Sequence, residues 1–149
     1  LFFLILIDIN SYLPSINAEI SKILQNTVGF TIELDADLNT NAMDIYINYG
    51  DSRRIIELAS GMEKMISSLA IRVALINVSS LPKSDILIID EGFGTLDDMN
   101  VEACNRLLVS LKRYFKHILI ISHVDAVKDI VDNVIDITKK GKDSRVYVN

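Results

Sequence analysis

This sequence has a single cysteine, no excess of basic charge and no long hydrophobic run. Each of these features argues against a class of protein. The single cysteine, Cys104, rules out an internal disulfide framework and a cysteine-based zinc site. We expect a packed core thiol or a near-surface thiol in a reducing, intracellular setting. A net charge of −5 argues against a generally basic DNA-binding surface. The apolar run at residues 1–7 is far shorter than the roughly 20 residues that span a bilayer, and it lacks the flanks of a signal peptide. No membrane role is expected.

The remaining composition suits one α/β domain. At 149 residues the chain is long enough to bury a real core, and with half of its residues apolar but few aromatic, that core should be aliphatic. The chain has no initiator methionine and begins inside a hydrophobic run, as a piece of a longer protein would. We expect the run at residues 1–7 to be covered by another lobe or subunit.

The first half of the chain predicts a helix and an antiparallel hairpin. The helical pattern begins at Ser11, which places Pro14 in a first turn, while residues 1–9 fit either a strand or a helix. Alternating apolar and polar residues then predict strands at 28–34 and 43–49, with an extension over 53–58.

The second half predicts a βαβ core. A helix at 61–78 is followed by alternating strands and helices, and the expected ranges are 86–89, 98–114, 117–121, 126–131 and 134–138, with an edge strand at 145–148. The strand Ile86–Ile89 has four consecutive apolar residues, which predicts burial on both faces, as in a parallel sheet.

Two carboxylates, Asp90 and Glu91, follow that strand directly and lead into a Gly-x-Gly turn. Ligands of open α/β sheets bind at the carboxyl ends of the strands. Asp90 could therefore hold the hydration shell of a nucleotide-bound Mg²⁺ while Glu91 points at an attacking water. The alternative is a solvated acidic turn.

A second motif, Ser60-Gly61-Met62-Glu63, opens the helix at 61–78. Ser-x-x-Glu is a capping box, with Ser60 as the N-cap and Glu63 at the third helical position. The same free N–H groups, beside a small glycine and a hydroxyl, also suit a phosphate.

A third motif places His123 immediately after the strand 117–121. If this strand neighbours the one that ends at Asp90, the imidazole lies at the same sheet edge, where it could donate to a γ-phosphate or orient a water. A local turn hydrogen bond is the alternative.

Together and in this order, the three motifs resemble the C-terminal lobe of an ABC-class ATPase. The wording Asp90-Glu91-Gly92-Phe93-Gly94-Thr95-Leu96-Asp97 resembles the SbcC branch of the SMC-like DNA double-strand-break repair ATPases. The resemblance implies an α/β fold of the P-loop NTPase class in which residues 1–149 form the C-terminal lobe of a head. Within it, residues 11–58 would be the helix and hairpin that lead in, and residues 59–149 would hold the motifs in a parallel βαβ core.

The resemblance also implies a role for each motif residue. Ser60, Gly61, Met62 and Glu63 would form the signature that contacts the γ-phosphate of ATP bound by the opposite subunit. Asp90 would support Mg²⁺, Glu91 would be the general base, His123 the switch histidine, and Asp97 a contact across the dimer. Met62 is a departure, because the family usually has a second glycine there.

No Gly-x-x-x-x-Gly-Lys-Ser/Thr phosphate cradle is present in the sequence. The resemblance therefore implies an ATPase that is active only when an N-terminal P-loop lobe completes it. Its implied partners are that lobe, a second head, an SbcD-type nuclease, and DNA bound through the assembled complex in the cytoplasm. Two alternatives remain: a nucleotide-binding fragment of an ABC transporter, or a non-catalytic remnant that only binds partners.

Overall fold

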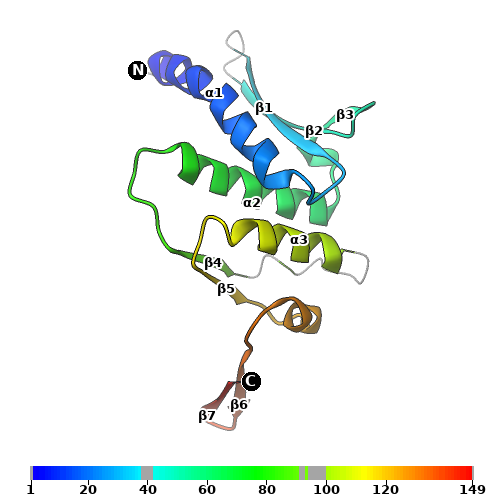
Figure 1. The fold of residues 1–149 in the computed structure, drawn as a ribbon, viewed down its shortest axis with the longest axis vertical. Helices are drawn as coiled ribbons and strands as arrows, with labels where there is room; N and C mark the ends of the chain where they lie inside the picture. The colour runs from blue at the N-terminus through cyan, green and yellow to red at the C-terminus, as the bar shows by residue number, and fades with distance from the viewer. Residues whose placement is uncertain (1, 38–41, 91–92, 94–99, 149) are drawn as a thin grey trace.

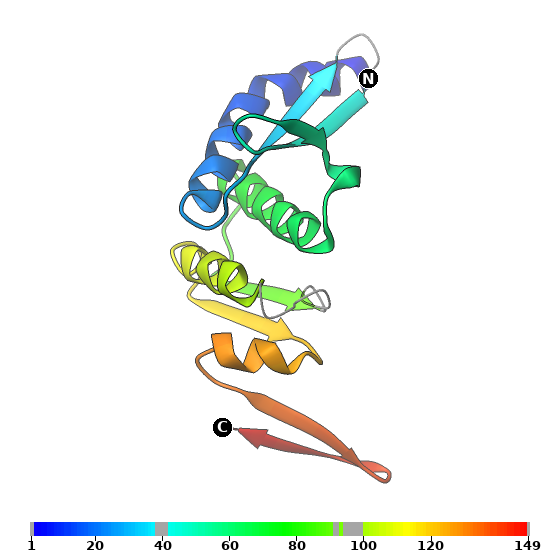
Figure 2. The same cartoon turned by 90° about the vertical axis from the view of Figure 1, so that its right-hand side faces the viewer.

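The structure, a computed structural model, describes residues 2–37, 42–90, 93 and 100–148, with side chains described from residue 11 onward. In chain order the elements are α1 (Phe2–Leu24), β1 (Thr31–Asp37), β2 (Ala42–Asn48), β3 (Arg53–Ile55), the 3₁₀ helix η1 (Ile56–Leu58), α2 (Gly61–Val78), β4 (Ile86–Asp90), α3 (Val101–Leu111), β5 (His117–Ile121), the 3₁₀ helix η2 (Asp125–Ile130), β6 (Ile135–Lys140) and β7 (Asp143–Val148). Figures 1 and 2 show an elongated molecule with α1 and β1–β3 at one end and the β6–β7 hairpin at the other.

Helix α1 is packed between the antiparallel sheet β1–β2–β3 and α2. The Asn17 side chain fixes it to the sheet, because its amide oxygen accepts from the Leu34 N–H and its amide nitrogen donates to the Leu34 carbonyl, both at 2.9 Å. Aliphatic side chains of α1, β1, β2 and α2 fill the space between, among them Ile20, Ile23, Ile32, Ile47, Ile66 and Val73. Among the described helices, none is long and apolar enough to cross a membrane.

Of the two predictions for residues 1–9, a strand or the end of a helix, the structure confirms the helix from residue 2 onward, but the placement of Pro14 in a first turn was wrong. The helix begins at Phe2, and Pro14 lies inside it. Proline removes one backbone hydrogen bond from a helix. The buried positions Leu13 and Ile16, on either side of Pro14, hold the helix against its neighbours across this gap.

The first strand was also placed too early, since β1 begins at Thr31 and not at residue 28. Residues 25–27 form a turn after α1, in which Asn26 adopts a left-handed backbone conformation with φ 62° and the Thr27 hydroxyl donates to the Ile23 carbonyl at 3.2 Å. The predicted extension at 53–58 divides into β3 and the 3₁₀ helix η1.

In the second half, the predicted bounds of α2 and β5 are confirmed. Strands β4 and β5 pair in parallel, with Ile88 opposite Leu119 and Asp90 opposite Ile121. Helix α3 is shorter than the predicted 98–114, and residues 98–99 lie outside the described part of the chain. Of the two placements expected for Cys104, the structure shows the core thiol, and burial raises its pKa to about 11.

Two predictions about the parallel core were wrong. Strand β4 is covered on one face only, because its Ile86 and Ile88 side chains are 52% and 61% exposed. The strand predicted at 134–138 does not join this sheet: β6 pairs with β7 through a turn at Gly141, whose φ is 66°, and the pair forms a separate two-stranded sheet. The helix predicted at 126–131 is the 3₁₀ helix η2.

Candidate functional site

The N-terminal end of α2 is a capping box, as predicted. The Ser60 hydroxyl accepts from the Glu63 N–H at 3.3 Å, and the Glu63 carboxylate accepts from the Ser60 N–H at 2.8 Å. The first N–H groups of a helix have no acceptor within it, and in α2 these include those of Gly61 and Met62. The helix start therefore retains donors for an anion while its cap is complete.

Met62, the departure from the family pattern, is half-buried against the hydrophobic core. Ser60 and Gly61 beside it are exposed. Because the Met62 side chain packs against the core, a ligand that approaches the start of α2 would meet the small residues Ser60 and Gly61.

The Glu63 carboxylate is held from the other side by two residues that lie outside the three sequence motifs. The Tyr49 hydroxyl donates to Glu63 Oε1 at 2.6 Å, and Arg54 Nη2 lies 3.2 Å from the same oxygen. Arg54 also donates to the Tyr49 hydroxyl and stacks on its ring, with the guanidinium carbon 4.6 Å from the ring centroid. Sequence reasoning missed both residues, and the strand alternation that places Arg54 on the face toward α2 was the available signal.

These contacts set the acidity of Glu63. Burial raises its pKa, but hydrogen bonds from the Tyr49 hydroxyl and from the Ser60 N–H and hydroxyl, together with the Arg54 charge, outweigh burial, so the pKa falls below its ordinary 4.5. A depressed carboxylate pKa stabilises the fold above the unfolded-state pKa and loses that effect as the pH falls through the folded value.

We expect Glu63→Gln to reduce the acid sensitivity of the chain. The free energy of unfolding of the wild type should exceed that of the variant most at neutral pH, and the gap should shrink as the pH falls below about 4.5 and through the lower folded pKa. Urea unfolding followed by circular dichroism across this range measures it. Glu57→Gln, at an exposed glutamate of η1, is the control. A gap that stays constant with pH would contradict the assignment.

The second group of predicted site residues lies where β4 and β5 end. Because the two strands are parallel and Asp90 pairs with Ile121, Asp90 and His123 come to the same edge of the sheet, and both side chains are exposed. The turn after β5 is formed by Ser122, whose hydroxyl accepts from the Val124 N–H at 3.1 Å. The predicted general base Glu91 and the predicted dimer contact Asp97 lie outside the described residues.

The two groups belong to different elements: the first lies at the start of α2, and the second lies at the ends of β4 and β5. Figure 2 shows the N-terminal end of α2 and the carboxyl ends of β4 and β5 on the same side of the molecule. Within the described ranges, no set of three or more histidine, cysteine, aspartate or glutamate side chains could hold a metal ion. A single exposed carboxylate such as Asp90 suits Mg²⁺ that keeps most of its waters.

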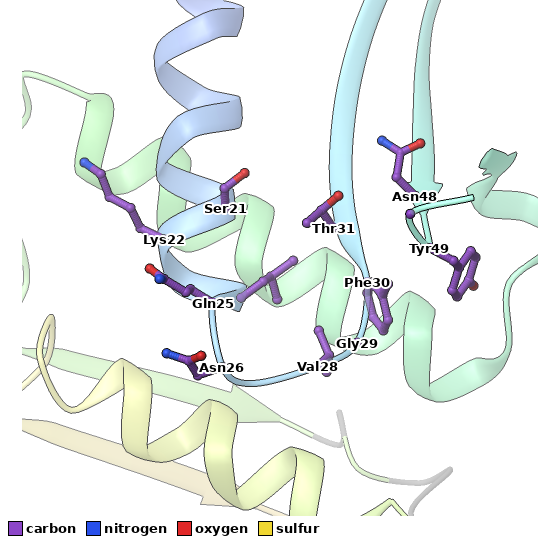
Figure 3. A pocket seen from close by; sticks show the side chains of 12 residues that line it. Ser21, Lys22, Gln25, Asn26, Val28, Gly29, Phe30, Thr31, Asn48 and Tyr49 are labelled. Carbon is purple, nitrogen blue, oxygen red and sulfur yellow. The ribbon is translucent and has the colours of Figure 1, made fainter. Parts of the chain in front are cut away.

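A surface hollow of about 550 Å³ lies between the C-terminal end of α1 and strands β1 and β2, and Tyr49, which contacts Glu63, is among its lining residues (Figure 3). Its lining includes Ser21, Gln25, Asn26, Phe30, Thr31 and Asn48. Of the predicted site residues that the structure describes, none lines it.

Comparisons with known proteins agree with this fold. No protein-family model matches the chain. An uncharacterized protein of Acanthamoeba polyphaga mimivirus is 35% identical over 156 aligned residues, which cover 95% of this chain and 12% of the relative. The SbcC component of the SbcCD nuclease of Staphylococcus epidermidis is 31% identical over 106 residues, covering 68% of this chain and 10% of the relative. The chain thus spans about a tenth of the length of these relatives.

Solved structures similar to the chain are SMC heads. A chain from work on the ATP-driven dimerization and DNA-stimulated activation of SMC ATPases superimposes with a TM-score of 0.75 at 21% identity, covering 93% of this chain and 86% of that one. The SMC head domain of Thermotoga maritima gives a TM-score of 0.59 at 25% identity, covering 91% and 46%. The expected family and fold class are confirmed: the chain belongs to the SMC-like ATPases that include SbcC, and it has the fold of the C-terminal lobe of their head.

Proposed function

We propose that this chain is the C-terminal half of an ATP-hydrolysing SMC-like DNA repair ATPase, whose heads dimerise around ATP and control a nuclease at DNA ends. The observation that carries the proposal is the parallel pairing of β4 and β5, which brings Asp90 and His123 to one edge beside an uncovered apolar face. The three motifs would supply half of a nucleotide site. The uncovered face leaves room for a P-loop lobe, whose phosphate cradle this sequence lacks.

The uncovered face supports the need for a second lobe. Parallel sheets normally have both faces covered. Here Ile86, Ile88, Leu119 and Ile121 share one face, all of them exposed, and Asp90 continues the same alternation at its rim. A P-loop lobe that packs on this face would bring its phosphate cradle up to the Asp90 carboxylate.

In the completed site each residue would have a distinct task. Asp90 would hold Mg²⁺ through its hydration shell, and the ion would neutralise charge on the phosphates. Glu91 would orient the water that attacks the γ-phosphorus, and His123 would donate a hydrogen bond to the γ-phosphate. ATP and water would give ADP and inorganic phosphate, with positioning and electrostatics as the main contributions.

The start of α2 would act on the nucleotide of the opposite head. Ser60 and Gly61 would offer a hydroxyl and backbone N–H groups to its γ-phosphate, and Asp97 would lie between the heads. Residues 11–58 would connect the head to the rest of the protein, and residues 59–149 would form the catalytic lobe. The likeness to SbcC supports an SbcD-type nuclease and DNA as partners, in preference to the membrane subunits of a transporter.

The test is ATP-dependent association of the complete head, in which this chain is combined with its own P-loop lobe. We expect ATP with Mg²⁺ to convert monomeric heads to dimers and to be hydrolysed, because each site needs the signature of the other head. Light scattering after gel filtration and release of phosphate measure the two effects. ADP in place of ATP is the control. Heads that neither dimerise nor release phosphate with ATP would refute the proposal.

A further inference from the structure

We propose that Arg54, with Tyr49, is a positioning residue of the signature: it compensates the Glu63 charge so that the start of α2 can accept a phosphate. The inference rests on the proposed function of α2. It assigns a role in nucleotide binding to two residues outside the three motifs.

The two oxygens of the Glu63 carboxylate contact different parts of the fold: one contacts the start of α2, and the other contacts Tyr49 and Arg54. One oxygen, Oε2, accepts from the Ser60 N–H at 2.8 Å and so lies at the first turn of α2. The other, Oε1, accepts from the Tyr49 hydroxyl at 2.6 Å and faces Arg54 Nη2 at 3.2 Å. The Glu63 side chain is only 12% exposed, so water screens its charge poorly, and the Arg54 side chain is 45% exposed.

A capping-box carboxylate and a bound phosphate compete for the same positive helix end. The N-terminal partial charge of a helix attracts either anion, and two negative groups in one place repel each other. An uncompensated Glu63 would therefore oppose a γ-phosphate at Ser60 and Gly61. The Arg54 guanidinium removes this repulsion while the Tyr49 hydroxyl holds the carboxylate in its capping position.

Arg53 provides a matched control for Arg54, because it also stacks on a tyrosine ring and pairs with carboxylates. It is the neighbour of Arg54 in β3, and its side chain is on the opposite face of the sheet, over the Tyr46 ring with 3.7 Å to the centroid. It forms ion pairs with Glu33 and Asp35 at 3.5 and 3.2 Å. Both arginines thus stack on a tyrosine and pair with carboxylates, but only Arg54 contacts α2.

The arrangement also joins two layers of the fold. Tyr49 follows β2 and Arg54 belongs to β3, whereas Glu63 belongs to α2 (Figure 1). A shift of the three-stranded sheet against α2 would separate Arg54 from Glu63 and return the uncompensated charge to the signature. The affinity for ATP would then be lower when the three-stranded sheet is shifted away from α2 than when Arg54 contacts Glu63.

The experiment compares Arg54→Gln with Arg53→Gln in the complete head. We expect Arg54→Gln to raise the ATP concentration for half-maximal dimerisation about tenfold, since an unscreened like charge would lie near the phosphate. The rate of hydrolysis at saturating ATP should change far less, and Arg53→Gln should leave both unchanged. Tyr49→Phe, which keeps the ring but removes the hydroxyl, should raise the same ATP concentration to a smaller extent.

The double variant Arg54→Gln/Glu63→Gln separates charge compensation from a merely structural role. Removing the Glu63 charge should restore most of the ATP affinity that Arg54→Gln loses, although it cannot restore the lost ion pair. Equal behaviour of Arg54→Gln and Arg53→Gln, or a double variant no better than Arg54→Gln, would overturn the inference and leave the proposed function intact. Failure of the wild-type head to dimerise with ATP would overturn the proposed function itself.

Discussion

In the complete head, replacing Glu91 by glutamine is expected to reduce ATP hydrolysis by about 10²–10⁴-fold while ATP still brings the heads together. Glutamine has nearly the shape of glutamate but cannot accept the proton of the attacking water. Asp90 keeps its place at the end of β4 in this variant, so Mg²⁺ and nucleotide should still bind. The loss should therefore appear in kcat and not in the ATP concentration that supports dimerisation.

Phosphate release under single-turnover conditions and light scattering with ATP separate chemistry from assembly in the Glu91→Gln head. Glu102→Gln is the matched control, because Glu102 is an exposed residue of α3 that pairs with Arg106 and lies outside the motifs. Hydrolysis at the wild-type rate in Glu91→Gln would remove Glu91 from the role of general base. A head that no longer dimerises would instead assign Glu91 to nucleotide binding.

The parts of the fold that the sequence predicted well are those with local signals. The helix 61–78 begins at a capping box and ends where its apolar periodicity stops, and both bounds are matched by α2. The order of Asp90 and His123 at the ends of two parallel strands followed from two short apolar runs joined by a helix. Each of these signals lies within a few residues of the feature that it predicts.

The parts that could not be predicted depend on contacts that the pattern of a single segment does not specify. A run of four apolar residues is the same whether a sheet is covered on one face or on two, so the exposure of Ile86 and Ile88 was not visible in it. The link from Arg54 and Tyr49 to Glu63 joins residues 9 and 14 positions apart, through a turn whose geometry no motif encodes. The pairing of β6 with β7 depends on the turn at Gly141.

The uncovered face of β4 and β5 leads to the second large effect, expected from Ile88→Asp. In the free chain the Ile88 side chain is 61% exposed, so aspartate there should leave the fold and its unfolding transition almost unchanged. In the completed head the same position would be covered by the P-loop lobe. An unpaired carboxylate buried in such an interface costs about 3–5 kcal/mol, which weakens the association more than 100-fold.

Titration calorimetry of the chain with its P-loop lobe measures this loss, and circular dichroism of the chain alone verifies the fold. Val109→Asp is the matched control: Val109 is 58% exposed, but it belongs to α3, on the other side of the sheet from Ile88. We expect this variant to bind the lobe as the wild type does. Equal binding by Ile88→Asp would mean that the lobe attaches elsewhere, and Asp90 would then lie too far from any phosphate cradle to act on its Mg²⁺. Because the apolar face lies beside Asp90, the same packing of the P-loop lobe that completes the head would also complete the nucleotide site.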